Sequence, residues 1–396
     1  MYINANQFSK MANVLFMIEH LRGGGAERVV AEISAELESL HQVYLIIFED
    51  KGTTYRHCKN VTCINISGTR NVFLKPINWV RRICAVKNFK KRNHIDITIS
   101  FISNSNMINV LSGGKNNICS VRTVLSSVSK NAIKKKIEEL ILKKADYVVS
   151  LSEYVKQDLV SNFSVPESKI RTIYNPIFRH QQSEISDQRP ASIREHEGLH
   201  FITAGRMVTA KGQWHIIKSF YSYRKHFGGK LTLLGDGPLK NQLEELVCYL
   251  GLTDSVIFKG FVEEPNVEYD KADVFIMSSL WEGFGNVIIE AMDSSLPIIC
   301  PECPGGPREI LNPGGGALTD FVAEYGLLTK PFPQLQDITK TEELTEEEEN
   351  LYEAMVYMTN TEVREKFRNL SAKRALDFSI DKIVKEWDCL IAKKTQ

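Results

Sequence analysis

The sequence lacks long uninterrupted apolar runs and a dense set of cysteines. Across 396 residues, no stretch approaches the roughly 18–20 apolar residues that a membrane-spanning helix needs. The apolar run 14–18 is followed at once by Glu19 and Arg22, so we expect no secretory signal. The eight cysteines are scattered and form no disulfide framework. These absences favour a cytoplasmic protein.

Several catalytic motifs are also missing. No Asp-x-Asp pair is present to hold Mg²⁺ on a diphosphate, and no HExxH, Walker or GxSxG motif occurs. Cys300 and Cys303 form the one close CxxC pair, but further thiol or imidazole ligands at a zinc spacing are absent nearby. We interpret this pair as turn residues, and we expect no metal and no cofactor.

Length and charge indicate two domains with different partners. A chain of 396 residues suits two domains of roughly 180–200 residues each. Residues 1–180 carry 26 Lys and Arg against 14 Asp and Glu, whereas the remainder carries 23 against 34. We expect the first half to face an anionic partner, for which lipid headgroups, a diphosphate-bearing substrate and nucleic acid are candidates. No motif of interleaved aromatic and basic residues supports nucleic acid.

Short apolar runs alternate with helical patterns in both halves, which indicates parallel βαβ units. Strands are predicted at 13–18, 42–48, 95–101 and 147–151, and then at 200–204, 230–234, 255–258, 273–277 and 297–300. The acidic run 342–349 is interpreted as a solvated helix face.

The predicted fold is α/β, with two Rossmann-like domains that face each other across a cleft. We place the first domain at 1–182, a linker at 183–198 and the second domain at 199–375. Residues 376–396 are predicted as a helix that packs back on the first domain. Ligands of such sheets bind beyond the carboxyl ends of the strands.

Two loops of the second half carry charges suited to a sugar diphosphate. After strand 200–204, Arg206 and Lys211 bracket one loop and could bind a diphosphate, although two solvated side chains are an equal alternative. After strand 273–277, Glu282 lies in a glycine-containing loop and Glu290 in the following helix. Asn286 is predicted to cap that helix, whose amino end would point at the ligand.

Two further loops are rich in glycine. Gly23, Gly24 and Gly25 follow the first strand at a helix start and could form a generic anion nest, without the spacing of a P-loop. Residues 303–309, Cys-Pro-Gly-Gly-Pro-Arg-Glu, could close over a donor, and plain turn chemistry explains them almost equally well.

Together these motifs resemble glycosyltransferase family 4, whose members retain anomeric configuration and have the GT-B fold. The resemblance covers Gly-Gly-Ala-Glu-Arg at 24–28, Gly-Arg-x4-Lys-Gly at 205–212, Gly-Asp-Gly-Pro at 235–238 and Glu-Gly-Phe-Gly-Asn-x3-Glu-Ala at 282–291. Within the family, the chain is similar to bacterial enzymes that extend undecaprenyl-diphosphate-linked oligosaccharides for N-glycans, O-antigen and capsule.

The resemblance implies roles for individual residues. Arg206 and Lys211 would bind the donor diphosphate, Glu290 the ribose and Glu282 the transferred sugar. The base would lie against the loop that contains Val262, and a backbone cradle would come from Gly283, Phe284, Gly285 and Asn286. The implied reaction is a metal-free transfer through an oxocarbenium-like state. The donor is expected to be a UDP-sugar, with GDP-mannose as the alternative.

One position departs from the family. Many relatives place a Glu-His pair after a strand of the first domain, and here Arg122 stands in the place of the histidine. A fixed cation there would favour an anionic group, either an acceptor phosphate or the departing diphosphate. His20, beside the glycine loop, is the second catalytic candidate, although a lone histidine is more often structural.

Residues 79–92 and 130–144 each combine an apolar stripe at near-helical spacing with lysines and arginines. Such helices can lie on an anionic membrane, or they can pack on the sheet with their lysines in water. With a lipid-linked glycan acceptor, we expect a peripheral protein on the inner face of the plasma membrane. The remaining alternatives are a non-hydrolysing sugar-nucleotide epimerase and a non-catalytic sugar-nucleotide-binding subunit.

Overall fold

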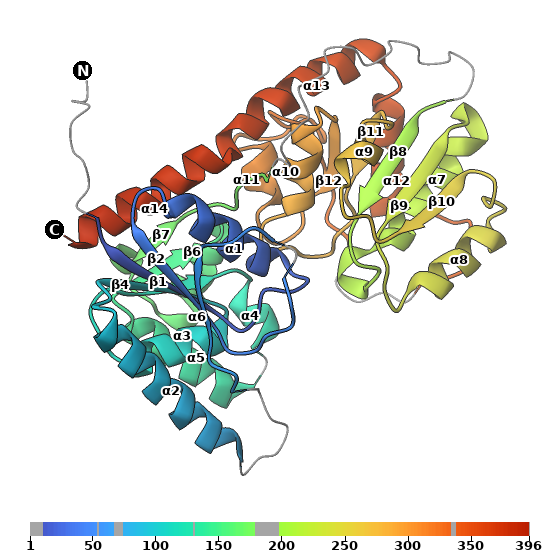
Figure 1. Cartoon of the computed structure of the whole chain (residues 1–396). Coiled ribbons are helices and arrows are strands. Elements are labelled where there is room, and N and C mark those ends of the chain that lie inside the picture. The colour runs from blue at the N-terminus through green and yellow to red at the C-terminus, as the bar shows by residue number, and fades with distance from the viewer. Residues whose placement is uncertain are drawn as a thin grey trace, which may run out of the picture. The chain divides into compact units, whose positions relative to one another are not determined.

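The computed structural model describes residues 11–53, 55–66, 74–129, 131–178, 198–333 and 338–395. The chain divides into two compact units, one formed by Met1–Pro176 with Ile380–Gln396 and the other by Ile177–Ser379 (Figure 1). The predicted linker at 183–198 lies outside the described residues except for its last position. Each unit has its own parallel sheet.

The first unit is built on a seven-stranded sheet of order β3-β2-β1-β4-β5-β6-β7. Adjacent strands all pair in parallel. Strand β1 is an apolar run that is buried from Val14 to Ile18, as expected where helices cover both faces of a sheet. Strands β4 and β5 are buried along their whole length although they contain the polar residues Ser100 and Ser120. The strands are β1 (Asn13–Ile18), β2 (Gln42–Ile47), β3 (Asn60–Cys63), β4 (Ile97–Phe101), β5 (Asn117–Val121), β6 (Tyr147–Ser150) and β7 (Ile170–Thr172).

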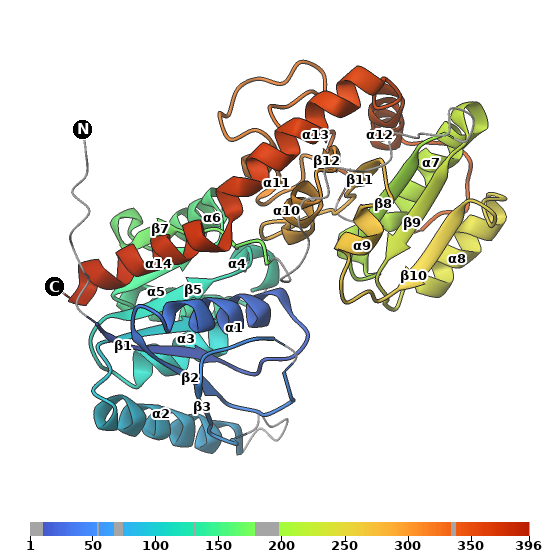
Figure 2. The same cartoon turned by 45° about the horizontal axis from the view of Figure 1, so that its top comes forward.

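Helices cover both faces of this sheet (Figure 2). The chain runs from β1 to β2 in one direction and from β4 to β7 in the other, so right-handed crossovers place α1 (Gly25–Leu37) opposite α3 (Ser103–Leu111) and α5 (Ala132–Lys144). Helix α2 (Leu74–Arg92) packs on α3. The remaining helices before residue 170 are α4 (Leu125–Val128), α6 (Glu153–Phe163) and the 3-10 helix η1 (Glu167–Lys169).

The last helix of the chain, α14 (Ile380–Thr395), belongs to the first unit. It contacts α1 and β4. Trp387 is fully buried there, with its ring centroid 6.0 Å from that of Phe101. Asp388 pairs with Nε2 of the buried His41 at 2.9 Å. Within the described residues, no helix combines the length and apolar character that crossing a membrane would require.

The second unit has a six-stranded parallel sheet of order β10-β9-β8-β11-β12-β13. Its strands are β8 (His200–Ala204), β9 (Lys230–Leu234), β10 (Val256–Gly260), β11 (Val274–Ile276), β12 (Ile298–Pro301) and β13 (Leu327–Thr329). Its helices are α7 (Gln213–Phe227), α8 (Lys240–Tyr249), α9 (Asn266–Tyr269), α10 (Asn286–Asp293), α11 (Pro307–Leu311), α12 (Glu346–Tyr357) and α13 (Thr361–Ala375), with 3-10 helices η2 (Thr209–Lys211) and η3 (Leu376–Phe378).

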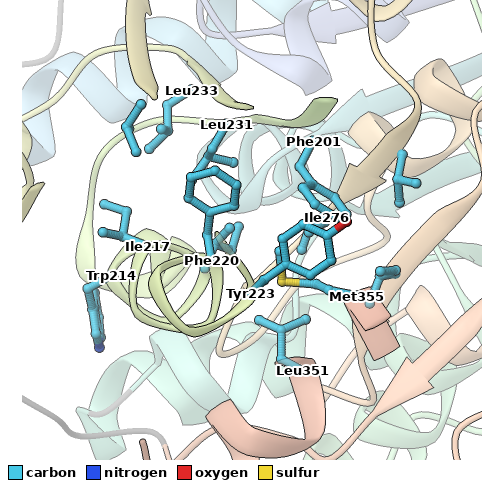
Figure 3. Packing of buried hydrophobic residues seen from close by; sticks show 14 of the residues in the cluster. Phe201, Trp214, Ile217, Phe220, Tyr223, Leu231, Leu233, Ile276, Leu351 and Met355 are labelled. Carbon is cyan, nitrogen blue, oxygen red and sulfur yellow. The ribbon is translucent and has the colours of Figure 1, made fainter. Parts of the chain in front are cut away.

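The core of this unit lies where α7 and α12 pack on the sheet and against each other (Figure 3). Phe201 of β8 meets Tyr223 of α7 edge to face, with ring centroids 5.0 Å apart. Leu351 and Met355 of α12 close the same cluster and are fully buried. The close packing of these aromatic and aliphatic side chains stabilises the sheet that supports the candidate site.

The interpretation of 342–349 as a solvated face is wrong for one residue. Glu348 is 1% exposed and accepts hydrogen bonds from Lys218 Nζ at 2.5 Å and from His215 Nδ1 at 2.8 Å. It also closes a capping box with Thr345 at the start of α12. Burial alone raises the pKa of Glu348, but the hydrogen bonds from His215 and Lys218 outweigh burial and lower it. Glu348 therefore joins α12 to α7.

The interpretation of Cys300 and Cys303 as turn residues holds for only one of them. Cys300 lies inside β12, whereas Cys303 lies in the turn after it. Both thiols are buried, and burial raises the pKa of each. Among the described residues, no group of three or more His, Cys, Asp or Glu side chains could hold a metal ion.

Candidate active site

The strand order of the second sheet reverses between β8 and β11. From β8 the chain continues to β9 on one side, and from β11 it continues to β12 on the other side. Loops beyond such a switch point diverge and leave room for a ligand. The two loops here are 205–212, after β8, and 277–285, after β11. They contain every charged residue that the sequence predicts for the donor site except Glu290.

Glycines hold the loops after β8, β9 and β10 close together. Gly205 N donates to Leu234 O at 2.9 Å, and Gly235 N donates to Gly260 O at 2.7 Å. Gly235 has φ +127°, and a Cβ atom there would collide with the carbonyl oxygen of Gly205. Glycine is therefore required at 235 for both backbone conformation and close approach.

Lys211 reaches the second loop through its backbone and its side chain. Ala210 O accepts a hydrogen bond from Leu280 N at 2.8 Å, and Ser278 Oγ donates to Lys211 O at 2.8 Å. The Lys211 ammonium forms an ion pair with Glu282 Oε1, which also accepts a hydrogen bond from Ser279 Oγ at 2.7 Å. These contacts bring together two charged residues that are 71 positions apart in the sequence.

The turn 303–309 positions Glu282, a role that the sequence did not reveal. Glu282 N donates to Pro304 O at 3.0 Å. Gly305 has φ +134°, and a Cβ atom on it would lie far inside contact distance of Glu282 O. A Cβ atom on Gly306 would lie 2.6 Å from Phe284 O. The two glycines therefore allow the turn to pack directly against the backbone of the Glu282 loop.

The predicted helix cap at Asn286 is wrong by one residue. Gly285, with φ +104°, is the N-cap of α10, and Asn286 is its first helical residue. The N-cap makes no side-chain hydrogen bond to this helix end, and the positive end of the helix dipole lies at the loop that contains Glu282. Phe284 is 2% exposed and packs on Phe378 with ring centroids 5.6 Å apart. Since that ring is buried, Phe284 can offer a ligand only its backbone.

Glu290 lies on α10 and is partly buried. It is close enough to Tyr269 to affect that phenol, since burial and then the negative charge of Glu290 raise the pKa of Tyr269. Arg206 is exposed, and its side chain pairs with no carboxylate of the described residues. Val262 is partly buried beyond β10, next to Phe261, which is 82% exposed.

The glycine loop of the first unit lies at the carboxyl end of β1. Gly24 is the N-cap of α1, and Gly23 has φ +78°. The Glu27 carboxylate lies directly over the Cα atom of Gly24. His20 Nδ1 accepts a hydrogen bond from Arg22 N at 3.3 Å and is 4.0 Å from Glu27 Oε1. A carboxylate of the chain itself thus occupies part of the predicted anion nest.

Arg122 follows β5, with β4 between that strand and β1. Its guanidinium donates to Asn175 Oδ1 and to Ile173 O at 3.5 Å, and lies 5.6 Å from the ring centroid of Phe101. Its Nε is buried without a hydrogen-bond partner among the described residues. Burial lowers the pKa of Arg122 to about 9. The nearby Ile102 has φ +72°, which is strained for a β-branched residue.

Comparisons with known proteins agree with this architecture. Residues 23–179 match the model of Glycosyltransferase Family 4, and residues 198–332 match the model of Glycosyl transferases group 1. The structure of Anabaena Alr3699/HepE in complex with UDP aligns with 96% of this chain and 100% of its own, at a TM-score of 0.73 and 17% identity. The fold is therefore GT-B, and the chain belongs to the family 4 glycosyltransferases.

Two relatives align with different shares of this chain. The chain is 36% identical over 263 residues to an uncharacterised glycosyltransferase of Methanocaldococcus jannaschii, over 63% of this chain and 64% of that relative's length. It is 25% identical over 388 residues to the N-acetylgalactosamine-N,N'-diacetylbacillosaminyl-diphospho-undecaprenol 4-alpha-N-acetylgalactosaminyltransferase of Campylobacter jejuni, which covers 95% of this chain and 98% of that enzyme.

Proposed function

We propose that this chain is a retaining, metal-independent glycosyltransferase. It moves a hexose or N-acetylhexosamine from a UDP-sugar to a lipid-linked oligosaccharide in bacterial surface polysaccharide or glycan assembly. The observation that carries the proposal is the contact between Lys211 and Glu282 beyond the switch point of the second sheet. This contact supports the proposal because it brings a cation suited to a diphosphate next to a carboxylate suited to a sugar.

The donor would lie across the carboxyl ends of β8 and β11. Lys211 and the exposed Arg206 supply positive charge for the diphosphate, and the amino end of α10 adds its dipole. Glu290, one turn into α10, would accept hydrogen bonds from the ribose hydroxyls. Phe261 and Val262 offer an apolar surface for the base. The UDP in the HepE structure and the N-acetylgalactosaminyl transfer named for the Campylobacter relative support a UDP-sugar donor.

In the reaction, the bond from the sugar C1 to the diphosphate oxygen breaks as the bond from C1 to the acceptor oxygen forms on the same face. The proton of the acceptor hydroxyl passes to the departing phosphate oxygen. Arg206 and Lys211 stabilise the negative charge that develops on the diphosphate. These two cations take the place of a metal ion. Glu282 orients the sugar through its hydroxyls and faces the positive charge that develops at C1. The relative's name specifies an α-linked product, and an α-linked product from an α-linked donor requires retention.

The acceptor side would be formed by the first unit. Arg122, a cation without a carboxylate partner among the described residues, would bind a phosphate of the acceptor. The diphospho-undecaprenol in the name of the Campylobacter relative supports a lipid-linked acceptor. Helix α5 exposes Ile133, Ile137 and Leu140 beside its lysines. This surface supports peripheral contact with the inner face of the plasma membrane.

The test is nucleotide release from a panel of UDP- and GDP-sugars in the presence of a polyprenyl-diphosphate sugar acceptor. We expect turnover with a UDP-sugar, loss of most of kcat in Glu282→Gln and a raised donor KM in Arg206→Ala. Arg224→Ala, an exposed arginine in the last turn of α7, is the matched control and should behave as wild type. Full turnover by both site variants would refute the mechanism, and turnover with GDP-mannose alone would reassign the donor.

A further inference from the structure

The first unit contains a cavity of about 530 Å³ on the side of its sheet that carries α3 and α5. This volume falls within the roughly 300–1,000 Å³ of small-molecule sites. Its walls come from α2, α3, α4, α5 and the end of β5. The catalytic scheme above makes no use of most of this space.

The two ends of the cavity differ in chemistry. At the carboxyl ends of β4 and β5, the lining includes the polar residues Ser103, Asn104, Ser120, Arg122 and Thr123, together with Ile102 and Val121. Toward the helices the lining is apolar and includes Trp79, Met107, Leu125, Ile133, Ile137 and Ile141. The cavity therefore suits a ligand with a polar head and an apolar chain.

The polar end is built for an anion. Arg122 lines the cavity, and its guanidinium donates to Ser120, Ile173 and Asn175 but pairs with no carboxylate of the described residues. Helix α3 begins at Ser103, and no side chain caps its first turn. A buried cation beside the amino end of a helix gains stability when an anion binds.

The lining also contains one carboxylate, Glu138. Its Oε2 accepts a hydrogen bond from Ser129, and Lys134 Nζ lies 3.9 Å from its Oε1. Ser129 and Lys134 thus compensate the Glu138 carboxylate in part, and its Oε1 accepts no hydrogen bond from the described residues.

The apolar end opens toward solvent through α5. Ile133 is 72% exposed and Ile137 is 42% exposed, although both line the cavity. Lys134 lies between them and is exposed. An apolar chain can therefore enter from a surface where lysines approach anionic headgroups.

We propose that this cavity binds the first isoprene units of the lipid-linked acceptor, with the acceptor diphosphate at Arg122. The proposal rests on the function proposed above and adds a subsite to it. The enzyme would then recognise its acceptor by the lipid chain as well as by the sugar. It should prefer a long polyprenyl chain to a short one even when the sugars are identical.

The test compares two acceptors with the same sugar and diphosphate in the same detergent, one with a single isoprene unit and one with an undecaprenyl chain. Ile137→Trp should fill the cavity from its exposed rim. Leu111→Trp is the matched control, because Leu111 is 43% exposed at the end of α3, another helix of the cavity wall, and does not line the cavity. Ile133→Trp is a second filling variant, and thermal melting checks that all three variants fold.

We expect wild type and Leu111→Trp to favour the long acceptor in kcat/KM. Both filling variants should lose about tenfold of this preference, since withdrawing ~60 Å² of apolar surface from burial changes a binding constant by about that factor. Arg122→Gln should lower kcat/KM for both acceptors alike, because both carry the diphosphate.

An unchanged chain-length preference in both filling variants would overturn the subsite. So would phosphatidylglycerol that competes with the long acceptor and not with the short one, since this result would assign the cavity to membrane lipid. Absence of turnover with either acceptor and every donor would instead refute the proposed function.

Discussion

Gly305→Ala tests whether the turn after β12 positions Glu282. The new Cβ atom would lie well under 3.0 Å from the carbonyl oxygen of Glu282, so the two backbones must separate. The required movement is on the order of 1 Å, and a misplacement of about that size can cost ~100-fold in rate. Alanine at φ +134° adds backbone strain of about 1–3 kcal/mol.

Arg206 and Lys211 lie on the other loop, so donor binding should be less affected than the chemical step. We expect kcat to fall by about 100-fold while the donor KM changes by only a few-fold. Nucleotide-release kinetics measure both constants, and urea unfolding measures the stability loss. Gly316→Ala is the control, since a Cβ atom there meets nothing within 4 Å and its φ is not positive. If Gly305→Ala keeps the kcat of this control, the turn does not position Glu282.

Three further predictions concern stability, metal and membrane. Glu348→Ala should cost about 3–5 kcal/mol in urea unfolding because Lys218 stays buried without its partner, whereas Glu346→Ala, at an exposed pair, should leave the urea midpoint nearly unchanged. Because the pKa of Glu348 is lowered in the folded protein, Glu348 stabilises the fold above its ordinary pKa of 4.5, and this stabilisation should fade as the pH falls below that value. A difference in unfolding free energy between wild type and Glu348→Ala that stays constant down to acid pH would contradict this. Excess EDTA should leave nucleotide release unchanged, and rescue of an EDTA-treated enzyme by Mg²⁺ would contradict the metal-free scheme. Replacing Lys136 and Lys144 on α5 by Gln should weaken binding to anionic liposomes roughly thirtyfold, about 1 kcal/mol per lysine, and equal binding by this variant would argue against that surface.

Most of the sheet could be predicted from the sequence because buried parallel strands are apolar runs. The predicted strands at 13–18 and 200–204 coincide with β1 and β8. Strands β3, β5, β7 and β13 went unpredicted. Asn117 and Ser120 interrupt the apolar pattern of β5, although this interior strand is buried throughout. The other three are edge strands of only three or four residues, and β3 has no fully buried residue. Edge strands this short contain too few residues for a periodic pattern of apolar residues to be recognised.

The positions of the two loops of the candidate site, 205–212 and 277–285, could also be predicted, because they follow from strand order and glycine content. The contacts between these loops could not be predicted. The pairing of Lys211 with Glu282 spans 71 positions, and the packing of Gly305 on Glu282 depends on where the turn after β12 lands. Glu348 shows the same limit, since an acidic run has no sequence signal for the one residue that faces His215 and Lys218.

The contacts of Glu282 explain how this site can be preorganised before a donor binds. Its carboxylate is held by Ser279, three positions away, and its backbone is held by the turn at Pro304. Lys211, by contrast, holds Glu282 only through a flexible side chain that is one quarter exposed. When a diphosphate arrives, the ammonium can therefore change partner while Glu282 keeps its place. The ion pair balances both charges in the free protein. Binding would exchange one anion for another at Lys211, while Glu282 keeps its hydrogen bond from Ser279 and faces the positive charge that develops at C1.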